Sequence, residues 1–147
     1  MVYCYNGKRM KKVFEYWMPD SDAHFERLIT KRVKNGGPAQ YQDDVRDEAY
    51  KHITDFNLAI DVGANVGLWA KHLAEKFNEI YAFEPISEVY ECLEKNVSGQ
   101  NVVLNNFALG NTNSTIELVY DSENTGASYV DDNSIGKGTI DIKRMDD

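Results

Sequence analysis

The sequence predicts an α/β fold built on a parallel β-sheet, and residues 58–104 carry the three observations behind this prediction. Short unbroken apolar runs at 58–60, 80–83 and 102–104 are typical of strands that are buried on both faces. Amphipathic segments with apolar residues at helical spacing separate these runs. A loop containing glycines follows the first run. The order is therefore β-α-β-α-β, which requires parallel strands joined by right-handed crossovers.

Two amphipathic helices are expected between these strands. The first runs from Asn65 to Phe77, and the second begins at Ile86 and closes at Ser98-Gly99. Cys92 falls inside the second helix beside its apolar stripe, so it is expected to be a buried or half-buried free thiol.

Residues 1–54 are expected to form an N-terminal leader with its own helices. A short strand is expected at 13–17. A helix follows over 25–33, because acids and a serine just before it can cap its first turn; these are Asp20, Ser21 and Asp22. A second helix is expected over 42–53, with an apolar stripe formed by Val45, Ala49 and Ile53.

Residues 55–147 are expected to form the domain that contains the parallel sheet. Beyond Gly110, Ile116 and Leu118 alternate with polar residues, which predicts a strand half exposed at a sheet edge. Residues 121–139 are rich in Asp, Asn, Ser and Gly and are expected to be loop. A last short strand is expected at 139–143.

Composition excludes several classes of partner. The chain has 147 residues, enough for one domain, and a net charge of -8, which argues against nucleic acid because phosphate binding needs a basic face. The basic clusters at 8–12 and 31–34 are interpreted as solvated faces. No apolar run approaches the ~20 residues of a membrane span.

The two cysteines, Cys4 and Cys92, show no metal-ligand spacing and indicate a reducing, cytoplasmic compartment.

The loop between the first strand and the first helix carries the chemistry. It reads Asp61-Val62-Gly63-Ala64-Asn65-Val66-Gly67. Gly63 would let the chain turn off the strand, and Gly67 would let the helix pack closely on the sheet. The amides between them are expected to face a ligand above the strand ends, where open α/β sheets bind their ligands.

The residues of this loop favour a cationic ligand over a dinucleotide. The dinucleotide fingerprint has a glycine where Asn65 stands, because a pyrophosphate must approach the backbone closely there. Asp61 would place a negative charge near that pyrophosphate. S-adenosylmethionine (AdoMet) carries a sulfonium and an amino group, which an acid attracts. We therefore expect AdoMet, and we keep a nicotinamide oxidoreductase as the less favoured alternative.

Two further places complete the expected site. Glu84 ends the second strand, at a surface position where an acid can accept both ribose hydroxyls. Asn106 ends the third strand and could reach the adenine amino group, with Phe107 beside it. The plainer alternatives are that Asp61 and Asn65 only cap a helix and that Glu84 and Asn106 are turn residues.

No residue is predicted to be the catalytic base. The histidines are expected at the surface; they are His24, His52 and His72. The loop 124–128 is a weak candidate for the face that meets a methyl acceptor.

Three segments resemble the FkbM family of AdoMet-dependent methyltransferases: residues 60–68, the run Tyr81-Ala82-Phe83-Glu84-Pro85, and residues 101–110. The resemblance covers residues 55–147. It implies a Rossmann-like methyltransferase fold and methylation of a hydroxyl on a sugar or other small molecule. It also implies that Asp61, Gly63, Asn65 and Gly67 hold the amino-acid part of AdoMet, with Glu84 at the ribose and Asn106 near adenine.

The same resemblance implies a fourth sheet strand after a segment like 139–147. The sequence stops before that strand, so the domain is expected to be partial. The strand at 58–60 would then have an open edge that recruits another chain. We expect self-association or a separately encoded C-terminal half. The alternative to an enzyme is a non-catalytic AdoMet-binding or interaction fragment.

Overall fold

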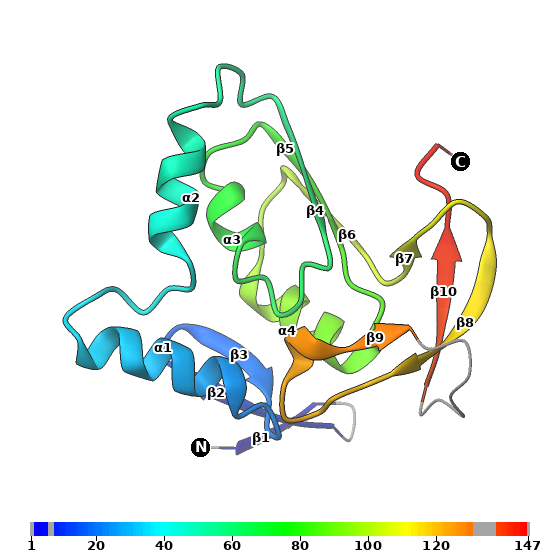
Figure 1. Cartoon of the computed structure of the whole chain (residues 1–147), viewed down its shortest axis with the longest axis horizontal. Helices are drawn as coiled ribbons and strands as arrows, with labels where there is room; N and C mark the ends of the chain where they lie inside the picture. The colour runs from blue at the N-terminus through cyan, green and yellow to red at the C-terminus, as the bar shows by residue number, and fades with distance from the viewer. Residues whose placement is uncertain (1, 6–7, 131–137, 147) are drawn as a thin grey trace.

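The computed structural model describes residues 2–5, 8–130 and 138–146. At its centre lies the predicted parallel sheet, in the order β4-β5-β6, formed by β4 (Leu58–Val62), β5 (Glu79–Phe83) and β6 (Val102–Asn105). All three strands run parallel, and Ile60 pairs with Tyr81. The β-α-β-α-β unit is thereby confirmed (Figure 1).

The helices of this unit differ in length. The second, α4 (Ser87–Asn96), is close to the prediction. The first is much shorter than expected, since α3 covers only Ala70–Leu73. The cause lies upstream, because Asn65 and Gly67 have φ angles of 52° and 88°, and left-handed residues interrupt a right-handed helix.

The N-terminal residues form a small antiparallel sheet and two helices. The sheet consists of β1 (Val2–Tyr5), β2 (Lys8–Val13) and β3 (Tyr16–Pro19). The predicted helices appear as α1 (His24–Lys34) and α2 (Asp43–Tyr50). On α2 the expected stripe is wrong, because Val45 is 52% exposed and Arg46 is buried.

Arg46 is buried because its guanidinium has acceptors on a neighbouring turn: it donates to the side chain of Gln40 and to the carbonyl of Tyr41. His72 is also buried, against the expectation for the histidines, and its Nε2 lies 2.8 Å from the Tyr16 hydroxyl. Burial lowers the pKa of His72. A polar partner explains each burial: for Arg46 it lies on the preceding turn, and for His72 it lies on a strand 56 positions away.

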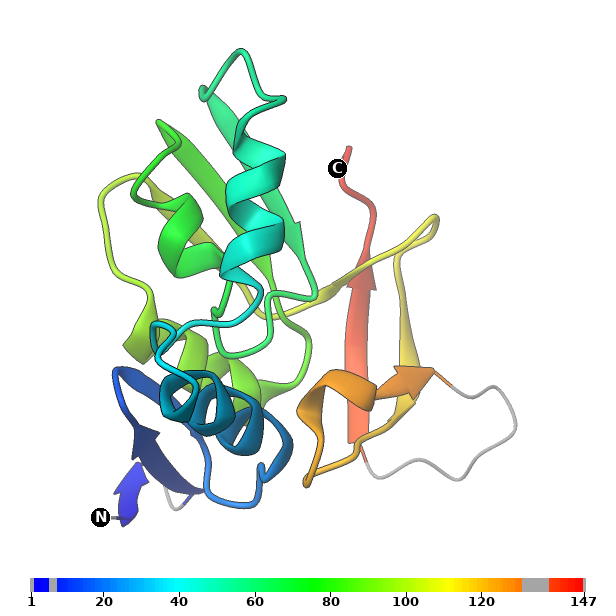
Figure 2. The same cartoon turned by 60° about the vertical axis from the view of Figure 1, so that its left-hand side comes forward.

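The C-terminal strands form a separate sheet in the order β7-β10-β8-β9. Its members are β7 (Ala108–Leu109), β8 (Ser114–Val119), β9 (Tyr129–Val130) and β10 (Gly138–Lys143). The last strand is confirmed, but β8 lies between β10 and β9 and is not at an edge. Figure 2 shows this sheet standing on the side of the parallel sheet opposite α2 and α3.

One apolar core joins the N-terminal residues to the glycine-containing loop that follows β4. It includes Met18 from β3 and Ile29 from α1 together with Val66 and Leu68 from the loop, and the buried thiol of Cys92. Asn96 reinforces this contact, since its side chain exchanges two hydrogen bonds with the backbone of Trp17 and donates a third to the Val66 carbonyl. Residues of the N-terminal sheet and α1 therefore hold the loop in place.

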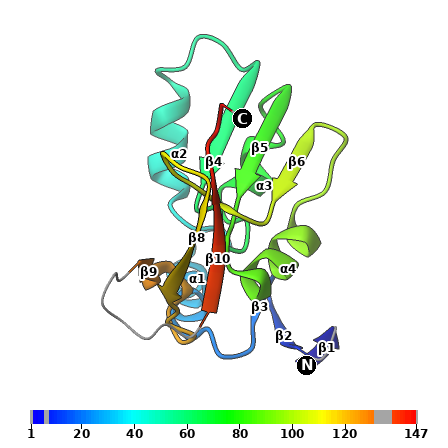
Figure 3. The ribbon, with the colours of Figure 1, turned by 90° about the vertical axis from the view of Figure 1, so that its right-hand side faces the viewer.

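The face of the parallel sheet that points away from α3 is bare, because its apolar side chains are exposed to solvent. Leu58, Ile60, Val62 and Val103 are between 41% and 62% exposed, and the register places them on one face. Figure 3 views the sheet from this side, with α3 behind it. Within the described residues β4 pairs only with β5, so one edge of β4 is also open.

Candidate functional site

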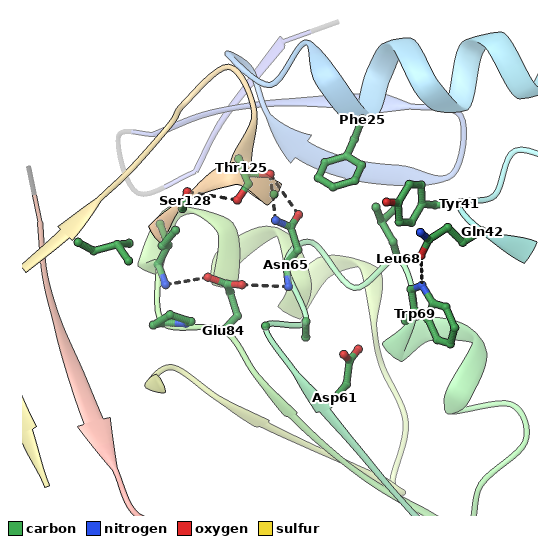
Figure 4. A pocket seen from close by; sticks show the side chains of 16 residues that line it. Phe25, Tyr41, Gln42, Asp61, Asn65, Leu68, Trp69, Glu84, Thr125 and Ser128 are labelled. Carbon is green, nitrogen blue, oxygen red and sulfur yellow. Dashed lines mark hydrogen bonds between the residues drawn. The ribbon is translucent and has the colours of Figure 1, made fainter. Parts of the chain in front are cut away.

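A cavity of about 320 Å³ lies above the carboxyl ends of β4 and β5. This is the position where open α/β sheets bind ligands, as predicted. Five of the predicted residues line it, namely Asp61, Gly63, Ala64, Asn65 and Glu84. Figure 4 shows Asp61 below Asn65, with Glu84 beside them.

Asp61 is the last residue but one of β4, and its side chain points to the helix-covered face of the sheet. The backbone N–H of Ala70 donates to its carboxylate. Its Oδ2 atom is buried and has no hydrogen-bond partner within the described part of the chain. Burial raises the pKa of Asp61 to about 6. A buried carboxylate oxygen without a donor costs free energy, so this atom is suited to a positively charged or donating ligand group.

Glu84 follows β5 directly and is only 4% exposed, which corrects the expectation that it lies at the surface. Its Oε2 accepts the N–H of Asn65 and its Oε1 accepts that of Ile86, both at 2.9 Å. Burial raises the pKa of Glu84 to about 7, although these two hydrogen bonds oppose the rise. Each carboxylate oxygen keeps acceptor capacity for one further donor.

The amides of the loop do not face a ligand as expected, because each is bonded within the protein. Gly63 and Ala64 both donate to the carbonyl of Phe83 at 2.9 Å. Asn65 donates to Glu84, and Val66 donates to the Asn65 side chain. The N–H of Gly67 donates to the Ala64 carbonyl. A pyrophosphate would find none of these five donors free.

Gly63 and Gly67 have different roles. Gly63 has φ +76° and open space around a Cβ position, which confirms the sharp turn off the strand. Gly67 has φ +88°, and a Cβ there would lie 2.6 Å from Val97 and 2.9 Å from Leu93. The close approach is thus to α4, not to the sheet, and Gly67 does not line the cavity.

Asn106 and Phe107 also lie outside the cavity lining. The Asn106 side chain donates to the Glu84 carbonyl at 2.8 Å and accepts from Ser87 at 3.1 Å. The Phe107 ring contacts that of Phe83, with centroids 5.5 Å apart, and the Lys143 ammonium lies 4.4 Å from the Phe107 ring centroid. Both residues support the end of β5 in this structure.

The remaining walls come from segments without a recognisable motif. Phe25 lies on α1, Tyr41 and Gln42 precede α2, and Trp69 donates to Gln42 at 3.1 Å. The opposite wall is the weakly predicted loop, through Thr125, Gly126 and Ser128. Among the described residues that line the cavity there are two acids and no Lys, Arg or His. The lining therefore favours a cationic ligand with an apolar body.

The described residues contain neither a candidate metal site nor a candidate membrane-spanning helix. No group of three or more His, Cys, Asp or Glu side chains there could hold a metal ion. No helix of this part is long and apolar enough to span a bilayer.

Comparisons with known proteins give little guidance. No family model matches the sequence, and no curated protein sequence matches it. Among solved structures, the chain is similar to Trm5b from Pyrococcus abyssi, with a TM-score of 0.38 and 22% sequence identity. The match covers 71% of this chain and 27% of that one, so the chain spans about a quarter of the length of that structure.

Proposed function

We propose that this chain binds AdoMet in the cavity above β4 and β5 and belongs to an AdoMet-dependent methyltransferase. The unpartnered Oδ2 of Asp61 carries the proposal, because it is a buried acceptor at the floor of a cavity lined by two acids and no base. AdoMet offers an ammonium and a sulfonium to such an acceptor. The volume of about 320 Å³ is within the range of small-molecule sites.

The occupied loop amides favour AdoMet over NAD. A dinucleotide site needs free N–H groups and a close backbone approach at the pyrophosphate. Here the N–H of Asn65 is bonded to Glu84, and the Asn65 side chain occupies the place of a glycine. The two nearby carboxylates would also repel the pyrophosphate.

In this proposal Asp61 and the loop hold the amino-acid part of AdoMet, and Glu84 accepts the ribose hydroxyls. Asn106 and Phe107 act indirectly, by fixing the strand end that carries Glu84. The aromatic wall of Phe25, Tyr41 and Trp69 excludes water from the apolar part of the cavity.

The finer proposal is methylation of a hydroxyl on a sugar or other small molecule, which the motif resemblance to the FkbM family suggests. Bound AdoMet would supply the methyl group. The chain would position the acceptor oxygen in line with the donor and exclude water. The acceptor must also lose its proton to a base, and the described residues that line the cavity offer no carboxylate beyond the two assigned to AdoMet.

That observation favours a second candidate, an AdoMet-binding module without its own catalysis. The hydroxyls of Thr125 and Ser128 do not change this, because Thr125 donates to Asp22 and Ser128 to the Thr125 carbonyl. In this candidate another chain would provide the acceptor site and the base.

Calorimetric titration of the purified chain with AdoMet, its demethylated product and NAD tests binding. We expect saturable binding of the first two and none of NAD. Tighter binding of NAD than of AdoMet would refute the proposal. Release of the demethylated product in the presence of hydroxyl acceptors then separates the enzyme from the binding module.

A further inference from the structure

Three segments that are distant in the sequence meet at the side chain of Asn65. Asp22 lies just before α1, Asn65 lies in the loop, and Thr125 begins the 3-10 helix η1 (Thr125–Ala127). The Thr125 hydroxyl lies 2.6 Å from Asp22 Oδ2 and 3.0 Å from Asn65 Nδ2. Figure 4 shows Thr125 directly above Asn65, with Glu84 on the other side.

Asp22 is fully buried and is satisfied entirely by hydrogen bonds. One carboxylate oxygen accepts the N–H of Phe25 in the first turn of α1 at 2.9 Å, although Asp22 lies one residue before the N-cap position, which is Ala23. The other accepts both the hydroxyl and the N–H of Thr125. A buried carboxylate needs such donors, so Asp22 fixes Thr125 in place.

Thr125 in turn fixes the Asn65 amide. A hydroxyl has one proton, and in Thr125 it is donated to Asp22. The same oxygen therefore accepts from Asn65 Nδ2, which leaves Asn65 Oδ1 to accept the N–H of Val66 at 2.8 Å.

The fixed side chain stabilises an uncommon backbone conformation. Asn65 has φ +52°, a left-handed geometry that is uncommon outside glycine and that asparagine adopts more readily than most residues. In this geometry its N–H points to Glu84 Oε2. The hydrogen bonds thus run without a break from Asp22 through Thr125 and Asn65 to Glu84.

The segment Asp121–Ser128 is held on α1 by further contacts. The N–H groups of Ala23 and His24 both donate to the Glu123 carbonyl at 3.1 Å. Gly126 lies against the Phe25 ring, where a Cβ would approach to 3.0 Å. The covering segment is therefore part of the site wall.

We propose that Asp22 and Thr125 are positioning residues of the AdoMet site, which act by holding Asn65 so that the loop and Glu84 are ready for ligand. The inference rests on the proposed function. It makes the covering segment Asp121–Ser128 and the start of α1 determinants of AdoMet affinity, although neither Asp22 nor the hydroxyl of Thr125 needs to touch the ligand.

Thr125→Val is the main test, because it removes the hydroxyl with little change of shape. We expect AdoMet affinity to fall about tenfold, corresponding to about 1.4 kcal/mol. Amide hydrogen exchange at Asn65 in the ligand-free protein should become faster. Thr125→Ser keeps the hydroxyl and should restore both to near wild type. Thr115→Val makes the same change at an exposed position of β8 and should have no effect.

Asn65→Gly is the second variant, since glycine accepts the left-handed backbone and lacks only the side chain. It should weaken AdoMet binding to a similar extent. The double variant should bind AdoMet no more weakly than either single variant, because both substitutions remove the same hydrogen bond between Asn65 and Thr125. Wild-type affinity in either variant, or additive losses, would overturn the inference. If wild-type protein binds no AdoMet, the proposed function fails. The exchange rate at Asn65 still decides the positioning role, because unchanged exchange in Thr125→Val refutes it.

Discussion

The Oε2 atom of Glu84 lies 2.9 Å from the backbone nitrogen of Asn65 and accepts its hydrogen bond. This contact ties the end of β5 to the loop that follows β4. The sequence predicts both residues as site residues, but it does not predict that one holds the other. The consequence is that Glu84 has a structural role as well as its proposed contact with ribose.

Glu84→Ala should therefore weaken both folding and binding. It leaves the N–H groups of Asn65 and Ile86 without their acceptor, and an unsatisfied buried donor costs about 1–3 kcal/mol. Loss of the ribose contact should reduce AdoMet affinity by about 1.5–3 kcal/mol. Urea denaturation and calorimetry measure the two effects. Glu48→Ala, at an exposed site on α2, should change neither, and unchanged stability in Glu84→Ala would contradict the structural role.

Acidification should weaken AdoMet binding. Burial raises the pKa of Glu84 to about 7 and that of Asp61 to about 6. Hydrogen-bond donors and positive charge on the ligand favour the ionised carboxylates, so binding should release protons between pH 6 and 7. Affinity should fall as pH drops from 8 to 5.5. Titration in buffers of different ionisation enthalpy measures the protons released, and a flat pH profile would contradict this assignment.

Asp61→Asn should separate stability from binding. A carboxyl whose pKa is higher in the folded than in the unfolded state opposes folding above the folded pKa. Removing the charge of Asp61 should thus stabilise the free protein at pH 8, by about 1–2 kcal/mol after allowance for solvent screening. The gain should be smaller at pH 5. AdoMet affinity should fall because the acceptor for its cationic groups is lost.

Denaturation curves at both pH values, run beside calorimetry, check this prediction. Asp47→Asn removes an exposed acid from α2 and serves as the matched control. A variant that is less stable than wild type at pH 8 would show that the Asp61 charge is satisfied in the fold.

The parallel sheet and the loop could be predicted from the sequence because their signals are local. Apolar runs, glycines and an acid after each of two strands are enough to place Asp61, Asn65 and Glu84 at one edge of a sheet. The walls of the cavity could not be predicted in the same way. Thr125 reaches Asn65 across 60 positions, and no periodicity or spacing marks such a contact.

Burial of polar residues could not be predicted either, because it depends on hydrogen-bond partners that the sequence pattern does not mark. Arg46 and His72 are residue types usually found at the surface, and no pattern marks the hydrogen-bond partner that each one finds when buried. The partner of His72 is 56 positions away, and that of Arg46 lies on an irregular turn before α2. The short α3 could not be predicted from the apolar stripe over 65–77. Apolar residues recur there at helical spacing, but Asn65 and Gly67 have left-handed backbone conformations, so the start of the stripe is not helical.

Gly67→Ala should destabilise the fold far more than Gly36→Ala. Both glycines have positive φ, +88° and +82°, so the conformational cost of adding a Cβ is similar. Only at Gly67 would the Cβ collide, with Val97 and Leu93 of the α4 region, whereas nothing lies within 4 Å at Gly36. We expect an additional loss of about 1–3 kcal/mol from overpacking. Equal denaturation midpoints for the two variants would show that α4 moves away without cost.

The bare face of the parallel sheet should drive self-association. Ile60, Val62 and Val103 expose apolar side chains on one face, and parallel sheets normally have both faces covered. The open edge of β4 adds unpaired backbone groups on the same side. Light scattering should therefore show a molecular mass that rises with protein concentration.

Val62→Lys places a charge on that face and should shift association to higher concentration without lowering stability, because the side chain is 62% exposed. Val45→Lys is the matched control: it makes the same change at a 52% exposed position on α2, away from the sheet. It should associate as wild type does. If the wild-type protein stays monomeric at high concentration, two copies do not meet through this face. If the two variants associate equally, the association takes place elsewhere on the chain.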